Sequence, residues 1–267
     1  MPPHLVEPAA ICASAAFVCW LLSVVTREYS WVDRMWSLLP PVYLWMFAAD
    51  ADFDPRLCLM AALGTAWGAR LTFNFWRKGG YAPGGEDYRW AILRARMPAW
   101  AWQAFNFAFT AGYQNLLIFL FTLPAAVVAG AEPTPLGPVD LVASLLFCGF
   151  LTLETVADQQ QWTFHLDKKL RLLRGEVPAE PFCRRGLWAW SRHPNFFAEQ
   201  AQWWVFTLFP LAVGVGWLNY GVVGAVLLTL LFDGSTRFTE AISLSKYPSY
   251  ADYQRTVSRW IPLPPRG

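Results

Sequence analysis

Long apolar segments alternate with short charged segments along this chain of 267 residues. A helix of about 20 apolar residues crosses the hydrocarbon core of a bilayer, and apolar segments near that length recur along the chain. The pattern predicts apolar helices at about residues 9–25, 36–49, 57–76, 97–131, 139–157, 196–214 and 218–232. We therefore predict an all-α fold, a polytopic membrane bundle of about seven transmembrane helices.

Two regions do not correspond to one simple span each. Residues 97–131 contain no charged residue, and as one straight helix they would extend about 50 Å, well beyond a core of about 30 Å. We expect Gly112 and Pro124 to break or kink this segment and part of it to be re-entrant. Residues 196–232 are expected to form a helical hairpin of two short spans separated near residues 214–217. Six spans are the alternative if either region does not fully cross.

The loops between the apolar segments differ in charge. Segment 77–96 carries five basic residues, 158–195 carries seven and 233–267 carries five. By contrast, loop 50–56 carries three Asp against one Arg, and loop 131–138 carries a single Glu. Basic loops stay in the cytoplasm, so the N-terminus is predicted outside and the C-terminus inside. With no internal repeat visible, one domain over residues 1–267 is the simplest organisation.

The composition agrees with an integral membrane protein of a bacterial inner membrane or of the endoplasmic reticulum. Hydrophobic residues make up 55% of the chain, and its 16 Trp suit interfacial belts and contact with membrane lipid. A net charge of +2 gives no case for nucleic-acid binding. The five cysteines show no zinc-site spacing and are expected to be packing residues. The oligomeric state is left open.

Charged residues inside the apolar segments raise a question of function, because burying a charge in a membrane is costly. Asp158 lies at the end of one apolar segment, one helical turn after Glu154, and Glu199 lies one turn into the next. Both Asp158 and Glu199 stand beside the same basic loop, which favours a functional site over snorkelling or helix-positioning pairs. For Asp33 the two interpretations are equally open. Arg70 lies within the third segment.

Two polar segments could hold an anion. The run Arg192-His193-Pro194-Asn195 precedes an apolar segment, and the N-terminus of a helix binds anions through its free N–H groups. His193 or Asn195 could equally be a simple helix cap. The glycine-rich loop at residues 79–90 would let a phosphate approach the backbone, with Arg89 neutralising it. Taken alone, an ordinary interhelical turn is the favoured interpretation of this loop.

Together these motifs resemble the steroid 5-alpha-reductase superfamily of integral membrane reductases, in its bacterial-type branch long filed as a domain of unknown function. The resemblance covers residues 28–262. The matching segments are Trp67-Gly68-Ala69-Arg70-Leu71, Gly85-Glu86-Asp87-Tyr88-Arg89-Trp90, Ala157-Asp158-Gln159, residues 186–199 from Gly-Leu-Trp to Phe-Ala-Glu, Tyr250-Ala251-Asp252-Tyr253-Gln254-Arg255 and Ser258-Arg259-Trp260-Ile261-Pro262.

The resemblance implies seven helices that hold NADPH in a cavity open to the cytoplasm and deliver hydride to an activated C=C bond of a lipophilic, sterol-like substrate. It places the substrate-side helices in residues 1–96 and the cofactor-binding half in residues 97–267. Carried over residue by residue, it assigns the nicotinamide end to Asn195 and Glu199, the cofactor's polar middle to Asp158, its phosphates to Arg70, Arg89 and Arg192 with His193 beside them, and closure from the tail to Tyr253 and Arg259.

The chain departs from the steroid reductases where they hold the substrate carbonyl. Their Gln-Glu pair is missing from the second segment, and Trp67 stands near the expected Tyr. Asp33, Tyr29 or Trp36 are the candidates to replace them, with Glu199 as a further catalytic candidate. Two alternatives stay open. One is a membrane methyltransferase of the isoprenylcysteine carboxyl methyltransferase type, which uses S-adenosylmethionine. The other is a non-catalytic lipid-binding membrane protein.

Overall fold

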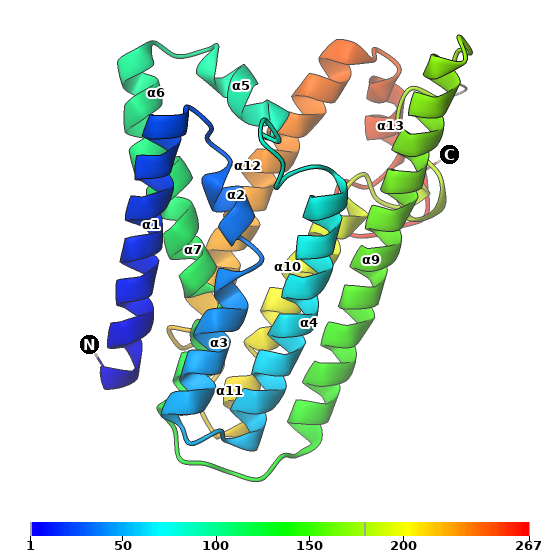
Figure 1. Cartoon of the computed structure of the whole chain (residues 1–267). Helices are drawn as coiled ribbons and strands as arrows, with labels where there is room; N and C mark the ends of the chain where they lie inside the picture. Colours follow the sequence, from blue (N-terminus) through cyan, green and yellow to red (C-terminus); the bar gives the residue numbers. More distant parts are fainter. Residues whose placement is uncertain (1, 179, 267) are drawn as a thin grey trace. The chain divides into compact units, whose positions relative to one another are not determined.

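The computed structural model describes residues 2–178 and 180–266 and is all-α, as predicted (Figure 1). The chain divides into two compact units. The N-terminal unit consists of Met1–Leu145 with Trp203–Leu228, and the C-terminal unit consists of Leu146–Gln202 with Thr229–Gly267. Three helices cross a boundary between these segments, and each unit is described by itself below.

The N-terminal unit is built from short and long helices in close succession. They are a 3₁₀ turn (Pro3–Leu5), α1 (Val6–Thr26), α2 (Trp31–Met35), α3 (Leu39–Asp50), α4 (Pro55–Arg77), α5 (Tyr88–Arg94), α6 (Ala99–Phe105), a π-helix (Asn106–Tyr113), α7 (Gln114–Leu120), α8 (Leu123–Ala129) and α11 (Phe209–Ala212). The start of α4 is fixed locally. The Asp54 carboxylate accepts hydrogen bonds from the amides of Arg56 and Leu57, and Pro55 occupies the first turn.

The predicted break in residues 97–131 is confirmed. The helical path from α6 to Leu120 stops, and α8 begins at Leu123 with a bend of 42°. Gly112 lies in the π-helix, and Pro124 lies in the first turn of α8, so both residues stand where the regular α-helix is interrupted. The extra residue per turn of a π-helix and the missing amide of proline account for the two interruptions.

Glycines allow α3 and α4 to approach closely. A Cβ atom on Gly64 would clash with Cδ1 of Leu44, and one on Gly68 would lie 2.5 Å from the backbone oxygen of Ser37. The Leu44 Cδ1 atom is the end of a side chain, which can rotate away. The Ser37 oxygen belongs to the backbone and cannot move alone. Gly68 is therefore the tighter constraint on this helix pair.

We expect Gly68→Ala to destabilise the protein by about 1–3 kcal/mol, because the added methyl group forces α3 and α4 apart. Thermal unfolding in detergent measures the effect. Gly149→Ala is the matched control, since a Cβ on Gly149 meets no atom within 4 Å. The control should be neutral or slightly stabilising through its better helix propensity. Equal melting temperatures for the two variants would contradict the packing argument.

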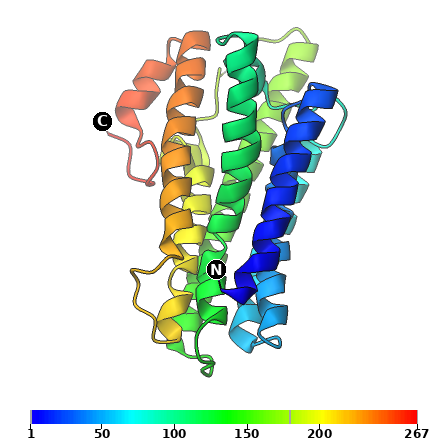
Figure 2. The same ribbon diagram turned by 90° about the vertical axis from the view of Figure 1, so that its left-hand side faces the viewer.

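The C-terminal unit contains part or all of four α-helices. They are α9 (Pro138–Leu173), α10 (Pro194–Phe206), α12 (Val222–Lys246) and α13 (Tyr250–Thr256), with a 3₁₀ turn at Gly186–Ala189. Figure 2 shows α12 as one continuous helix. The apolar segment predicted at about 139–157 covers only part of its helix, because α9 continues to Leu173. Likewise, α12 runs past the predicted end at residue 232 to Lys246.

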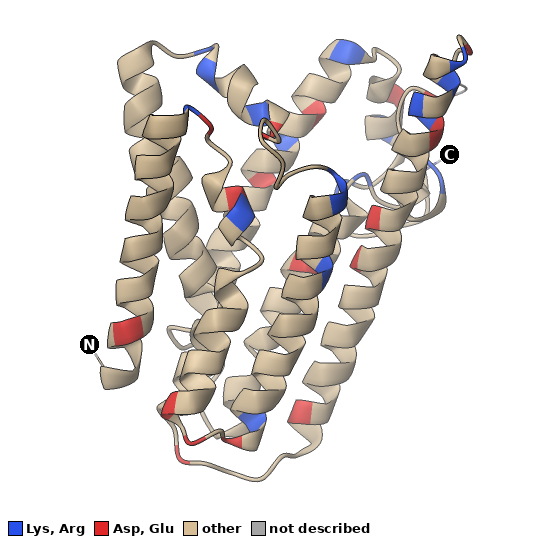
Figure 3. Cartoon of the chain, in the orientation of Figure 1, with Lys and Arg blue, Asp and Glu red and all other residues tan. Residues whose placement is uncertain are grey.

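Both errors have the same physical origin. Hydropathy marks the part of a helix that lipid can cover, while a helix continues into water wherever its residues favour it. Charged residues gather in the C-terminal part of α9 (Figure 3), where Arg171 pairs with Asp167 at 2.8 Å across one turn. The helix ends at Leu173, and Gly175, two residues later, has a positive φ of 75° that suits the residue after a helix cap.

Three helical stretches among the described residues are long and apolar enough to cross a membrane: Pro3–Thr26, Pro138–Leu173 and Val222–Lys246. The bent pair of Ala99–Leu120 and Leu123–Ala129 makes a fourth if it counts as one span. These helices are those of an integral membrane protein. At 1.5 Å per residue, the 12-residue α3 is only about 18 Å long, so it falls short of a core of about 30 Å. The seven-span topology stays a prediction.

Candidate functional site

The turn that precedes α10 is held in place by the C-terminal tail. Ser191 forms an isolated parallel bridge with Ser258. The amide of Arg192 donates to the backbone oxygen of Ser258 at 2.8 Å, and the amide of His193 donates to that of Arg259 at 3.1 Å. The predicted anion-binding turn is therefore a fixed element, shaped by residues more than 60 positions further along the chain.

Arg192 and His193 meet at one buried carboxylate. The guanidinium of Arg192 donates to Glu240 Oε1 at 2.6 Å and Oε2 at 3.2 Å, and also to the backbone oxygens of Gln254 and Val257. The His193 Nε2 atom lies 3.0 Å from Glu240 Oε1. We call Arg192, His193 and Glu240 the buried triad. In this structure, the Arg192 side chain joins the turn to α12 and the tail.

Asn195 and Asp158 lie within hydrogen-bond distance of each other. The Nδ2 group of Asn195 donates to Asp158 Oδ1 at 3.1 Å, which fixes the orientation of the amide. The Oδ1 atom of Asn195 is buried and accepts no hydrogen bond from the described residues. Glu199 follows one turn later on α10 and is 7% exposed. The start of α10 thus presents a fixed amide acceptor, with two buried or nearly buried carboxyl groups on the same helix pair.

The two tail residues of the predicted site are engaged with the protein itself. The hydroxyl of Tyr253 donates to the backbone oxygen of Trp188. Burial raises the pKa of Tyr253, so its phenol stays neutral at physiological pH. Arg259 pairs with Asp233 of α12 at 2.7 Å. Both contacts fix the tail against the rest of the C-terminal unit, and a direct cofactor contact by either residue stays a prediction.

Tyr29 and Asp33 converge in the N-terminal unit around a cluster of tryptophans. The Asp33 Oδ2 atom accepts from Nε1 of Trp90 at 2.9 Å. The Tyr29 hydroxyl accepts from Nε2 of Gln103 at 3.3 Å, and its ring packs edge-to-face on Trp102 with a centroid distance of 4.8 Å. Burial raises the pKa of Asp33, which favours the protonated carboxylic acid. A carboxyl group with a raised pKa and a phenol therefore lie on one aromatic cluster.

The glycine-rich loop at residues 79–90 forms part of that cluster. Gly79 adopts a positive φ of 84°, and a Cβ on Gly85 would clash with the Gly79 backbone oxygen, so glycine is required at these turns. The Glu86 carboxylate accepts a hydrogen bond of 2.7 Å from the amide of Tyr29. The loop thus serves as a structured interhelical connection that orders the segment around Tyr29.

Arg89 and Arg70 were both predicted to contact cofactor phosphates. Arg89 forms a two-bond pair with Asp87, with its Nη2 atom 2.8 Å from Asp87 Oδ2, and the arginine side chain remains 28% exposed. Arg70 lies on α4, partly buried. The two residues lie in the N-terminal unit, while Asp158, Asn195 and the buried triad lie in the C-terminal unit.

Sequence reasoning missed Glu240, the central carboxylate of the buried triad, and Gln254, which donates to Glu240 Oε2 at 2.9 Å. Glu240 follows the last predicted apolar segment by eight residues, so it did not count among the charges inside apolar segments. The signal was present, because Glu240 stands among Phe238, Ala241 and Ile242. Had the last helix been predicted to continue to Lys246, Glu240 would have counted as a charge on its apolar part.

The described residues contain no group of three or more His, Cys, Asp or Glu side chains placed to hold a metal ion. All five cysteines are free thiols in the structure, and Cys12, Cys19 and Cys183 are buried.

Sequence comparison places the chain in a family. An uncharacterized protein of Schizosaccharomyces pombe is 39% identical to this chain over 261 residues, which cover 92% of this chain and 76% of the relative. No solved structure matches the chain. A family model described as a protein of unknown function, DUF1295, matches residues 19–257. The chain therefore belongs to the DUF1295 family.

Proposed function

We propose that this protein is an integral membrane reductase that uses NADPH to reduce an activated C=C bond of a lipophilic substrate. The proposal comes from the resemblance of its motifs to the steroid 5-alpha-reductase superfamily. The observation that carries it is the buried, unsatisfied Oδ1 atom of Asn195 at the start of α10.

The environment of Asn195 fits a nicotinamide. A buried carbonyl oxygen without a hydrogen-bond donor costs free energy, so such an atom points to a missing partner. Because Asp158 holds the Nδ2 group, the amide cannot simply rotate to satisfy its oxygen within the protein. The carboxamide N–H of a nicotinamide is a donor of the required kind. Glu199, buried one turn further on, would hold the same end of the cofactor.

On the substrate side, Asp33 and Tyr29 would hold the carbonyl oxygen of an enone. A protonated carboxylic acid and a phenol are both hydrogen-bond donors, and either would stabilise negative charge that develops on that oxygen. When bound, NADPH would supply the hydride that adds to the β-carbon of the C=C bond. The tryptophans and Phe side chains around Tyr29 would keep water from the reacting groups.

The phosphate assignments rest on the resemblance alone. Arg192 already binds a carboxylate and two backbone oxygens, which makes it the support of the turn in the proposed site. Arg89 keeps an exposed portion beside Asp87 and would reach a phosphate by exchanging one carboxylate for another anion. Arg70 is the third proposed phosphate residue.

We also propose the seven-span topology with the N-terminus outside, supported by the basic residues of segments 77–96, 158–195 and 233–267. A C-terminal fusion to a reporter that is active only in the cytoplasm should be active. A reporter at the C-terminus that is active only outside the membrane would contradict this orientation.

The first test is a thermal-stability titration of the purified protein in detergent with NADPH, NADH and S-adenosylmethionine. A ligand that binds only the native state stabilises it by about 2.7 kcal/mol at a concentration of 100 Kd. We expect NADPH alone to raise the melting temperature. A rise with S-adenosylmethionine alone would replace the proposal by methyl transfer. No rise with any of the three would favour a lipid-binding protein.

We expect Asn195→Ala to weaken NADPH binding by about tenfold, the loss of one good hydrogen bond, while leaving the melting temperature of the ligand-free protein nearly unchanged. Removing Asn195 also removes an unsatisfied buried acceptor, so little stability is lost. Gln200→Ala, on the same helix, is the control, because its amide donates to the backbone oxygen of Phe196 and is assigned no contact with the cofactor. NADPH affinity equal to that of the unmodified protein in Asn195→Ala would sink the nicotinamide assignment.

A further inference from the structure

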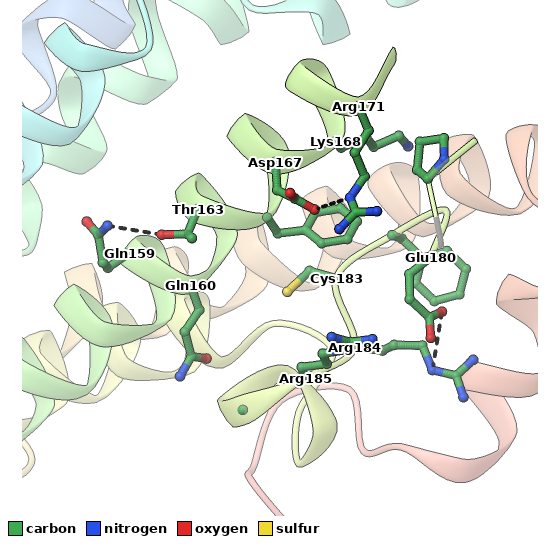
Figure 4. Close-up of a pocket in the computed structure, with 14 residues that line it drawn as sticks. Gln159, Gln160, Thr163, Asp167, Lys168, Arg171, Glu180, Cys183, Arg184 and Arg185 are labelled. Atoms are coloured by element: carbon green, nitrogen blue, oxygen red, sulfur yellow. Dashed lines mark hydrogen bonds and ion pairs between the residues drawn. The ribbon is translucent and has the colours of Figure 1, made fainter. Parts of the chain in front are cut away.

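A pocket with many polar side chains in its lining lies wholly within the C-terminal unit, between the C-terminal part of α9 and the loop that follows it. Its volume is about 510 Å³. Figure 4 shows the side chains of α9 on one side, among them Thr163 and Asp167, and those of the loop, among them Cys183 and Glu180, on the other. None of the residues assigned to the cofactor or the substrate lines this pocket.

The pocket lies on the opposite face of α9 from the Asn195–Asp158 pair. Successive residues of an α-helix are rotated by about 100°, so Asp167, nine residues after Asp158, points about 180° away from it. Gln160, Phe164 and Arg171 line the pocket together with Asp167, at spacings of three and four residues that keep them on this face. The pocket and the proposed cofactor site are thus separate places on one helix.

Positive charge exceeds negative charge in the lining. Arg171 pairs with Asp167 at 2.8 Å and Arg184 lies 3.8 Å from Glu180, so these four charges balance. Two further cations line the pocket, Lys168 and Arg185. Lys168 donates to the Pro181 backbone oxygen and the Tyr247 hydroxyl, both neutral acceptors. Within the described part of the chain, no carboxylate pairs with either Lys168 or Arg185.

The rest of the lining suits a group that is anionic and carries several acceptor oxygens. Gln159 and Thr163 supply an amide and a hydroxyl, and the amide of Gln160 stands beside them. Phe164 and Phe182 form apolar walls. Burial raises the pKa of the Cys183 thiol, which therefore stays protonated and adds no negative charge.

We propose that this pocket is a binding site for a phosphate-bearing anion, with Lys168 and Arg185 neutralising the phosphate. Cationic side chains with polar donors beside them are the usual means of recognising a phosphate group. The group can belong to an anionic lipid, since α9 leaves the apolar zone just before the pocket, or to a soluble phosphate compound. The inference does not depend on the reductase proposal, because it uses none of that site's residues.

The test uses two probes on the purified full chain in detergent. Inorganic pyrophosphate is titrated by calorimetry at fixed ionic strength. Dioleoyl phosphatidic acid in mixed micelles is compared with dioleoyl phosphatidylcholine by its effect on the melting temperature. Binding of pyrophosphate supports a soluble phosphate compound, and stabilisation by phosphatidic acid alone supports a lipid headgroup. If neither probe binds, the proposal is overturned.

Variants distinguish the pocket from general surface charge. Arg185 is exposed, so the Arg185→Gln variant should fold. Its affinity for the probe that binds should fall by about tenfold, as expected for one lost charge-assisted hydrogen bond. Lys168→Gln should do the same. Lys169→Gln removes the same charge from the neighbouring, exposed position of α9 that does not line the pocket, and affinity should stay within about twofold. Equal losses in Arg185→Gln and Lys169→Gln would overturn the proposal.

Probe binding to the Asn195→Ala variant distinguishes this pocket from the proposed cofactor site. Pyrophosphate or phosphatidic acid should bind the Asn195→Ala variant as well as the unmodified protein. If Asn195→Ala weakens the probe and Arg185→Gln does not, the probe occupies the α10 site and the separate pocket is excluded. Failure of NADPH to stabilise the protein would remove the reductase proposal and leave this measurement unaffected.

Discussion

Arg56→Met should destabilise the protein by about 3–5 kcal/mol, the expected cost of leaving a buried carboxylate without its cation. Arg56 is 1% exposed, and its guanidinium forms a two-bond ion pair with Asp140 at 2.6 and 2.9 Å. It also donates to the backbone oxygens of Thr134 and Pro135 and to the Thr134 hydroxyl. One side chain thus joins the start of α4 to the first turn of α9 and to the loop before it.

The measurement is thermal unfolding in detergent, with the double variant Arg56→Met/Asp140→Leu as the matched comparison. Replacing both charges by apolar groups removes the uncompensated carboxylate, so the double variant should recover a large part of the lost stability. If the double variant is as unstable as the sum of the two single variants, the pair does not act as a unit. A melting temperature unchanged in Arg56→Met alone would show that water reaches the site.

The hydropathy pattern predicted where the helices lie better than where they end. The apolar segments correspond to α1, α3, α4 and the interrupted path from α6 to α8, because lipid and core both select for the same residues. The continuation of α9 to Leu173 and of α12 to Lys246 was not predicted, since those turns are polar. Helix ends outside the apolar zone depend on propensity and caps that hydropathy does not measure.

Parts of the candidate site could be predicted from charged and polar residues at the ends of apolar segments. Asn195 was assigned to the nicotinamide end of the cofactor and Asp158 to its polar middle, and in the structure the two side chains form a hydrogen bond of 3.1 Å. Asp33 and Tyr29 likewise converge near Trp90. The ion pairs could not be predicted from the sequence, because they join residues far apart in the chain. Arg56 was counted only as the one basic residue of an outer loop, although it pairs with a residue 84 positions away.

Glu240→Ala should have the largest combined effect on stability and on the proposed site. It leaves Arg192 buried without its carboxylate and removes the partner of His193, with an expected loss of about 3–5 kcal/mol. Because Glu240 also accepts a hydrogen bond from Gln254, the tail loses a contact with α12 at the same time. We therefore expect a lower melting temperature and, in the protein that remains folded at low temperature, loss of stabilisation by NADPH.

Two further variants keep this expectation testable. Glu240→Gln retains an oxygen that can accept from Arg192 but removes the charge, so its stability should lie between those of Glu240→Ala and the unmodified protein. Asp233→Asn, on the same helix, weakens a pair with Arg259 that is about one-third exposed, and it should cost no more than about 1 kcal/mol. If Glu240→Ala has the same melting temperature as Asp233→Asn, loss of the Glu240 carboxylate does not leave Arg192 as an uncompensated buried charge. If Glu240→Ala is unstable but retains full NADPH stabilisation, the triad supports the fold and the turn before α10 needs no help from it to bind the cofactor.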